Sequence, residues 1–144
     1  MKKMQDRVAI ITGATSGIGK ATALLFAKEG ANIVITGRRK ELGLQVESEI
    51  QQHGARCIFI QADHCKTENC EDVVRKTISE FGKIDVLFNN SGIVTQGTAD
   101  TITDEVWLST MDTNVTAVLR MCRLVIPQMR LQGKGVIINN GSDW

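Results

Sequence analysis

Apolar stretches alternate with helical patterns along the whole chain. Short runs rich in β-branched residues, flanked by glycine or polar residues, predict strands, and the segments between them show the spacing of amphipathic helices. The expected strands are 7–12, 32–36, 56–61, 84–88 and 136–140. The expected helices are 17–29, 40–53, 67–81 and a long region, 103–131, that we expect to be interrupted near Asp112 and kinked or ended at Pro127.

This alternation predicts an α/β fold. Strands that are almost continuously apolar are typical of a parallel sheet covered on both faces. Right-handed crossovers then favour a doubly wound (Rossmann) sheet with strand order 3-2-1-4-5. The 144 residues suit a single domain, 1–144. Because the last strand would be an uncovered apolar edge, we expect a truncated fold that is the front portion of a longer protein.

Composition and charge exclude several classes of protein. Hydrophobic residues make up 42% of the chain, charged residues 23%, and the net charge is +1 without a basic block, which gives nucleic-acid binding no support. No apolar run approaches the roughly 20 residues of a membrane span, and the apolar segment after the charged start is too short for a signal peptide. We therefore expect a cytoplasmic protein without a membrane or nucleic-acid partner.

The four cysteines form no Cys-x-x-Cys pair. His64 and Cys65, followed by Cys70, match no common zinc spacing, and two further ligands are not evident. We expect reduced thiols and no metal site.

A glycine-rich turn, Thr12-Gly13-Ala14-Thr15-Ser16-Gly17-Ile18-Gly19, joins the first expected strand to the first helix. Gly13 can adopt the angles of a tight turn, Gly17 lets the backbone approach a pyrophosphate, and Gly19 lets the helix pack closely on the sheet. The helix N-terminus offers free N–H groups to phosphates. We predict dinucleotide binding by Gly13, Thr15, Ser16, Gly17, Ile18 and Gly19; the alternative is a purely structural turn.

The Gly-x-x-x-Gly-x-Gly spacing, preceded by Thr12, resembles the short-chain dehydrogenase/reductase family. Asn89-Asn90-Ser91-Gly92 is similar to the family's Asn-Asn-Ala-Gly motif, which implies that Asn90 and Gly92 belong to the cofactor site. Asp63 matches the family's aspartate that accepts a hydrogen bond from the adenine amino group. Alternatively, Asp63 caps the next helix or lies in a solvated loop.

The end of the second strand indicates which cofactor binds. An acidic residue there binds the ribose hydroxyls of NAD, whereas an arginine accommodates the 2′-phosphate of NADP. Gly37 stands in the acidic position and Arg38 follows it. NADP(H) is therefore the favoured cofactor and NAD(H) the alternative, unless Arg38 is only a solvated start to the next helix.

The resemblance implies hydride transfer between nicotinamide and a small-molecule carbonyl or alcohol, and a homo-oligomer, dimer or tetramer, when complete. It places Ser142 at the catalytic serine and Asn114 at the asparagine of the proton relay. The chain contains no tyrosine, however, so the family's Tyr-x-x-x-Lys motif is missing. We predict cofactor binding without turnover; the alternative is a non-catalytic nucleotide-binding or regulatory module.

Overall fold

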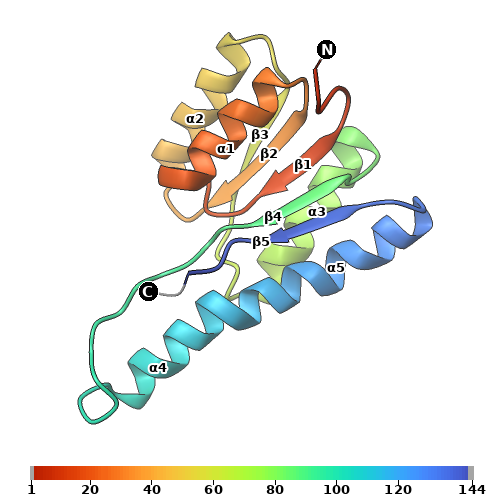
Figure 1. The fold of residues 1–144 in the computed structure, drawn as a ribbon. Helices are drawn as coiled ribbons and strands as arrows, with labels where there is room; N and C mark the ends of the chain where they lie inside the picture. The colour runs from red at the N-terminus through yellow and green to blue at the C-terminus, as the bar shows by residue number, and fades with distance from the viewer. Residues whose placement is uncertain (1, 143–144) are drawn as a thin grey trace.

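A five-stranded parallel sheet forms the centre of the protein. The computed structural model describes residues 2–142. The strands are β1 (Val8–Ile11), β2 (Asn32–Gly37), β3 (Cys57–Gln61), β4 (Val86–Asn89) and β5 (Val136–Asn139). They lie in the order β3-β2-β1-β4-β5 (Figure 1), and every neighbouring pair is parallel. The predicted strand order 3-2-1-4-5 is confirmed.

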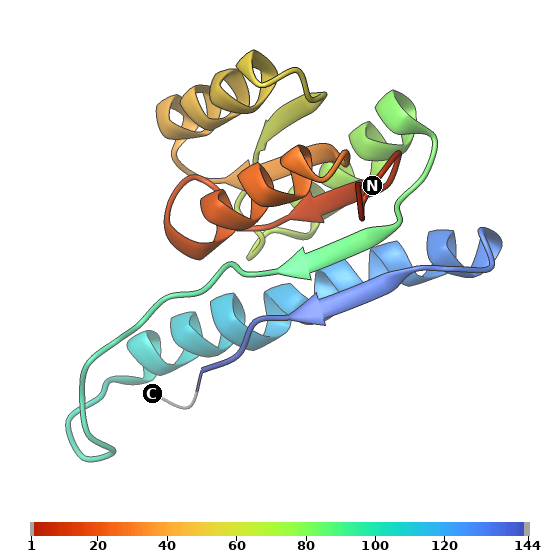
Figure 2. The same cartoon turned by 45° about the horizontal axis from the view of Figure 1, so that its top comes forward.

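Helices cover both faces of this sheet (Figure 2). The helices are α1 (Gly17–Lys28), α2 (Lys40–Gln52), α3 (Thr67–Phe81), α4 (Asp104–Met111) and α5 (Ala117–Leu131). Ile11 and other strand residues of its face pack in one core with α1 and α2, whereas the adjacent Ile10 packs in a second core with α3 and α5. Because successive strand residues point to opposite faces, this division confirms the doubly wound architecture.

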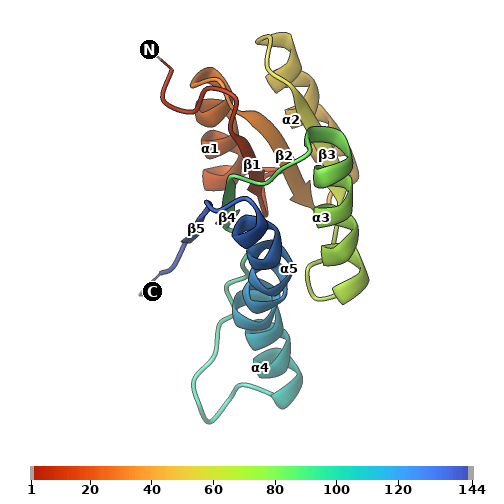
Figure 3. The ribbon, with the colours of Figure 1, turned by 90° about the vertical axis from the view of Figure 1, so that its right-hand side faces the viewer.

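The long helical region continues through the interruption that the sequence predicted. Between α4 and α5 lies one π-helical stretch, Asp112–Thr116, which we call the π segment. The predicted break near Asp112 is therefore a local widening of the helix. Pro127 does not end the helix either, since α5 runs on to Leu131. Figure 3 shows α4 extending away from the sheet, and α4 has no buried residue.

β5 is an edge strand of the described sheet, with 54% of Val136 and 40% of Ile138 exposed.

The buried carboxylate of Asp85 lies at the amino ends of the strands. It accepts a hydrogen bond from the backbone N–H of Val8 at 2.9 Å. Asp85 thereby fixes the start of β1 against β4. Among residues 2–142, none of the helices has the length and apolar character needed to cross a bilayer.

Candidate functional site

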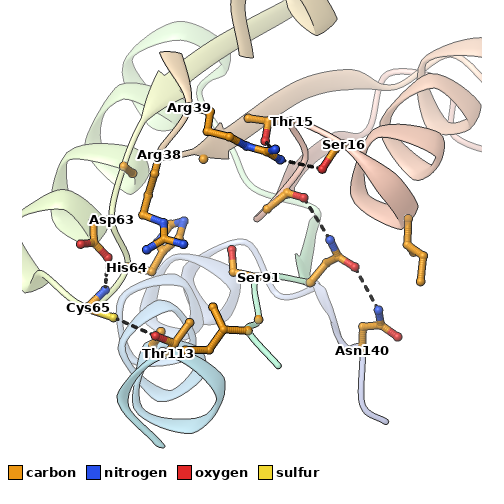
Figure 4. A pocket seen from close by; sticks show the side chains of 18 residues that line it. Thr15, Ser16, Arg38, Arg39, Asp63, His64, Cys65, Ser91, Thr113 and Asn140 are labelled. Atoms are coloured by element: carbon orange, nitrogen blue, oxygen red, sulfur yellow. Dashed lines mark hydrogen bonds between the residues drawn. The ribbon is translucent and has the colours of Figure 1, made fainter. Parts of the chain in front are cut away.

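A cavity of about 440 Å³ opens where the parallel strands end (Figure 4). Six segments line it: the glycine-rich turn, the residues that join β2 to α2, the loop after β3, the loop after β4, the π segment and the start of α5 through Thr113 and Ala117, and Asn140 just after β5. β1 and β4 are neighbours, while the chain passes from β1 to β2 on the other side. The cavity thus lies at the point where strand order reverses, which is where open α/β sheets bind ligands.

The structure brings most of the predicted cofactor residues together. The residues that line the cavity include Gly13, Thr15, Ser16, Ile18, Arg38, Asp63, Asn90 and Gly92. Gly17 and Gly19 are not among them. Gly13 has a φ of +64°, a left-handed conformation that side chains disfavour. A Cβ on Gly19 would collide with the carbonyl oxygen of Gly13, so close packing at this helix start requires glycine.

Asn90 holds the glycine-rich turn in place. Its side-chain Nδ2 donates hydrogen bonds to the carbonyl oxygens of Thr12 and Gly13, each at 3.2 Å. Its backbone N–H donates to the hydroxyl of Thr12 at 3.0 Å. Asn90 therefore fixes the shape of the turn and joins it to the end of β4.

The first turn of α1 faces the cavity through Ile18, with Ser16 at the N-cap position. Ser16 makes no side-chain cap hydrogen bond to the helix. Its hydroxyl instead accepts a hydrogen bond from Nη2 of Arg39 at 2.6 Å, and the same nitrogen donates to Thr15 at 2.9 Å. The N–H groups at a helix start lack intrahelical acceptors, so this arrangement leaves them available to an anion.

Sequence reasoning missed Arg39. It singled out Arg38, the exposed residue directly before it, because Arg38 follows Gly37. The structure places both arginines on the cavity wall (Figure 4). The signal for Arg39 was the second consecutive arginine, but only the fold shows that its guanidinium reaches the glycine-rich turn.

Gly37 and Thr15 share one small space. A Cβ built on Gly37 would lie 2.5 Å from Cγ2 of Thr15. The methyl group of Thr15 thus occupies the place that an acidic side chain at position 37 would need.

The loop after β3 is tightly structured. Oδ1 of Asp63 accepts a hydrogen bond from the backbone N–H of Cys65 at 3.1 Å, which closes a local turn. His64 is buried, and its Nε2 lies 2.7 Å from the hydroxyl of Thr36. Burial lowers the pKa of His64 to about 4, although the nearby carboxylate of Asp63 opposes this shift. The imidazole of His64, which also lines the cavity, is therefore neutral near neutral pH.

The two residues predicted to be catalytic lie outside the cavity lining. Asn114 belongs to the π segment, and its side chain binds Ile93 at both ends: Oδ1 accepts from the backbone N–H at 2.8 Å and Nδ2 donates to the carbonyl at 2.9 Å. Ser142 is exposed and follows the cavity residue Asn140 by two positions. The amide of Asn114 therefore fixes the start of the loop after β4.

All four cysteines are free. Within the part of the chain that the structure describes, His, Cys, Asp and Glu side chains form no group of three that could hold a metal ion.

Comparison with known proteins gives a consistent family. The model of the short chain dehydrogenase family matches residues 7–144. An uncharacterized oxidoreductase of Thermotoga maritima is 38% identical over 139 residues, which cover 96% of this chain and 55% of the relative. The 3-oxoacyl-acyl-carrier-protein reductase FabG of Staphylococcus epidermidis is 34% identical over 135 residues, covering 93% of this chain and 55% of the relative.

A solved structure, assigned to a short-chain dehydrogenase/reductase of Burkholderia xenovorans, superimposes with a TM-score of 0.93 at 28% sequence identity. The match covers 96% of this chain and 57% of that one. The chain thus spans about half the length of the relatives that it matches. On this family match, together with the sheet and the glycine-rich turn, the chain belongs to the short-chain dehydrogenase family.

Proposed function

We propose that the chain forms the NADP(H)-binding part of an oxidoreductase that transfers hydride between nicotinamide and a carbonyl or alcohol substrate. The observation that carries this proposal is the cavity at the reversal of strand order, bordered by the N-terminus of α1 and by two arginines. The helix N-terminus suits the pyrophosphate. Asp63, Asn90 and Gly92 border the same cavity and supply the remaining contacts of the proposed site.

The arginines favour NADP(H) over NAD(H). A guanidinium can bind a 2′-phosphate through two parallel charge-assisted hydrogen bonds. Gly37 offers no carboxylate to the ribose hydroxyls, and Thr15 fills the space beside it. We assign the 2′-phosphate to Arg38, with Arg39 and the hydroxyls of Thr15 and Ser16 beside it.

Calorimetric titration of the 144-residue chain with NADPH and with NADH tests this proposal. We expect tighter binding of NADPH. The Arg38→Ala variant should weaken NADPH binding by about tenfold or more and leave NADH binding nearly unchanged, because a hydrogen bond to a charged group contributes roughly 1.5–3 kcal/mol. Lys40→Ala removes a neighbouring charge that does not line the cavity and should have little effect. Equal or tighter binding of NADH would refute the NADP(H) preference.

The proposed reaction needs more than this chain contains. The bound nicotinamide supplies or accepts the hydride. The hydroxyl of Ser142 is proposed to hydrogen-bond the substrate oxygen, and Asn114 is proposed to support the proton relay while its amide holds Ile93. No tyrosine is present to donate the proton. We therefore expect the 144-residue chain to bind cofactor without turnover.

A second candidate is a nucleotide-binding module that does not catalyse, which remains open because none of these 144 residues is a tyrosine. An assay of NADPH oxidation with aldehyde and ketone substrates examines both candidates. Turnover by the 144-residue chain would contradict our expectation. Activity that appears only in a longer chain carrying Tyr-x-x-x-Lys would support the oxidoreductase, whereas binding that never leads to turnover in any form would support the module.

We further propose that the protein forms a homo-oligomer through the long helical region. Trp107, Met111, Val115 and Leu119 recur at four-residue intervals along α4, the π segment and α5, and each is at least 36% exposed. Such a stripe on one side of a helix is suited to packing against a second helix. Light scattering should show a dimer or larger species, which Leu119→Glu should dissociate. A monodisperse monomer of the complete, unmodified protein would contradict this proposal.

A further inference from the structure

The π segment touches two walls of the cofactor cavity. Oγ1 of Thr113 lies 3.4 Å from Sγ of Cys65, in the loop after β3 (Figure 4). The next residue, Asn114, binds the backbone of Ile93 in the loop after β4. Two consecutive residues of one helical turn therefore reach the two loops on which the cavity walls are built.

Arg120, one turn into α5, adds a second link to the loop after β3. Its Nη1 donates a hydrogen bond to the carbonyl oxygen of His64 at 3.3 Å and to Oδ1 of Asp112 at 2.8 Å. The Arg120 side chain is 20% exposed and that of Asp112 35%, so the pair is partly withdrawn from solvent. The Asp112 carboxylate thus orients the guanidinium toward a backbone atom of the cavity wall.

A hydrogen bond to the His64 carbonyl fixes the backbone in the middle of the loop after β3. This carbonyl lies between Asp63, which borders the cavity, and Cys65, which closes the turn with Asp63. Its other donor is the thiol of Cys70, at 3.5 Å, which is a weaker donor than a guanidinium. Arg120 is consequently the charged contact that joins the loop after β3 to α5.

We propose that Arg120 is a positioning residue of the cofactor site: it holds the His64 carbonyl, and through it the loop that carries Asp63, at the distance from the glycine-rich turn that the adenosine half of the cofactor requires. This inference rests on the proposed binding of NADP(H) in the same cavity. Arg120 does not line the cavity, so it acts through the loop and not by touching the cofactor.

The chemistry of arginine fits this role. A planar guanidinium offers several donors in fixed directions, and here one nitrogen serves a carboxylate and a carbonyl at the same time. A lysine at position 120 could serve one or both acceptors through its flexible ammonium group, with poorer orientation. Methionine matches the length of the side chain but donates nothing. The ranking Arg, then Lys, then Met is therefore expected for any property that depends on this contact.

The test measures binding of two cofactor fragments to the 144-residue chain by calorimetry. Adenosine 2′,5′-bisphosphate probes the adenosine half of the site, and reduced nicotinamide mononucleotide probes the other half. Arg120→Met should weaken binding of the bisphosphate about tenfold and leave binding of the mononucleotide within about twofold. Arg120→Lys should recover part of the loss, and Asp112→Asn should give a smaller loss because the guanidinium keeps its carbonyl acceptor.

Arg123→Met is the matched control, since Arg123 is an exposed residue of the same helix. It should change neither fragment's affinity. Equal weakening of both fragments in Arg120→Met, in step with a lower unfolding temperature, would show a general structural role and overturn the inference. Unchanged affinity for the bisphosphate would overturn it as well. If the unmodified chain bound neither NADPH nor the bisphosphate, the proposed function itself would fail, which is a distinguishable result.

Discussion

Nδ2 of Asn140, just after β5, donates a hydrogen bond to Oδ1 of Asn90, just after β4, at 2.9 Å. Because Asn90 in turn donates to the carbonyl oxygens of Thr12 and Gly13, one side chain connects the ends of three neighbouring strands. The glycine-rich turn is therefore tied to the strand ends on one side of it, and its shape depends on the amide group of Asn90.

Replacement of Asn90 by aspartate removes both donated hydrogen bonds and places a carboxylate against two carbonyl oxygens. We expect a loss of about 1–3 kcal/mol in the free energy of unfolding, the cost of breaking half-buried polar contacts. Binding of NADPH in the proposed site should weaken by at least tenfold, because the added charge also borders the cavity to which we assign the phosphates. Urea unfolding and calorimetry measure the two effects.

Asn140→Ala is the control for this substitution. It removes the hydrogen bond from the exposed Asn140 to the half-buried Asn90. The hydrogen bonds that Asn90 donates to the turn stay intact. Its cost should stay below about 1 kcal/mol. A similar cost for both variants would show that the turn does not depend on the donors of Asn90.

The close approach of Gly37 and Thr15 gives a second prediction. Gly37→Ala places a Cβ 2.5 Å from the Thr15 methyl group and should destabilise the protein by about 1–3 kcal/mol through overpacking. Thr15→Ser removes that methyl group and keeps the hydroxyl that accepts from Arg39. The double variant should therefore recover most of the stability lost in Gly37→Ala. Thermal unfolding of the four proteins measures the coupling, and strictly additive effects would contradict the steric explanation.

The arrangement of the sheet was predictable because local patterns determine it. Continuous apolar runs separated by helical spacing indicate a parallel sheet, and the handedness of crossovers leaves few possible strand orders. The glycine-rich turn could likewise be located, because the backbone geometry of the turn and the close packing of the helix both require glycine.

The rest of the site depends on contacts between distant segments. The sequence pointed to Arg38, which follows Gly37, and only the position of α2 relative to the turn directs Arg39 to Thr15 and Ser16. The π segment has no pattern of its own in the sequence. Its residues are held by partners far along the chain, such as Ile93 for Asn114. Periodicity could therefore predict a helix with a break, but not the π-helical geometry of that break.

Asp85 gives a prediction for stability in acid. Burial alone would raise the pKa of this carboxyl group, but the N–H of Val8 and the nearby Lys83 and Arg7 outweigh burial and lower it. A depressed pKa stabilises the fold above the ordinary value of 3.8, and this contribution is lost as pH falls through the lower value of the folded state. Asp85→Asn should lower the free energy of unfolding at pH 7. It should also make that free energy less dependent on pH below about pH 4.

Urea unfolding at pH values between 2.5 and 7 measures this effect of Asp85→Asn. The exposed carboxylate of Asp104 supplies the control: Asp104→Asn should leave the shape of the curve nearly unchanged. A variant at position 85 that is as stable as the unmodified protein at pH 7 would refute a stabilising role for this buried carboxylate.

His64 gives a prediction for a different pH range. Its pKa falls from 6.5 to about 4 in the folded chain, mainly because of burial. Between these values the unfolded chain binds a proton that the folded chain does not, so stability decreases as pH falls from 6.5 toward 4. The total change from this group is roughly 3 kcal/mol, since each pKa unit corresponds to about 1.4 kcal/mol. The imidazole is fully neutral above this range, where its hydrogen bond with Thr36 is undisturbed.

His64→Gln should remove most of this slope, because glutamine does not titrate and its amide can still bond the Thr36 hydroxyl. His53→Gln, at the exposed second histidine of the chain, should keep the slope. Urea unfolding at half-unit steps from pH 4 to pH 7 separates the two variants. If the His64 variant retained the slope of the unmodified protein between pH 4 and pH 6.5, another group would have to account for it, and the buried neutral imidazole would not be the cause.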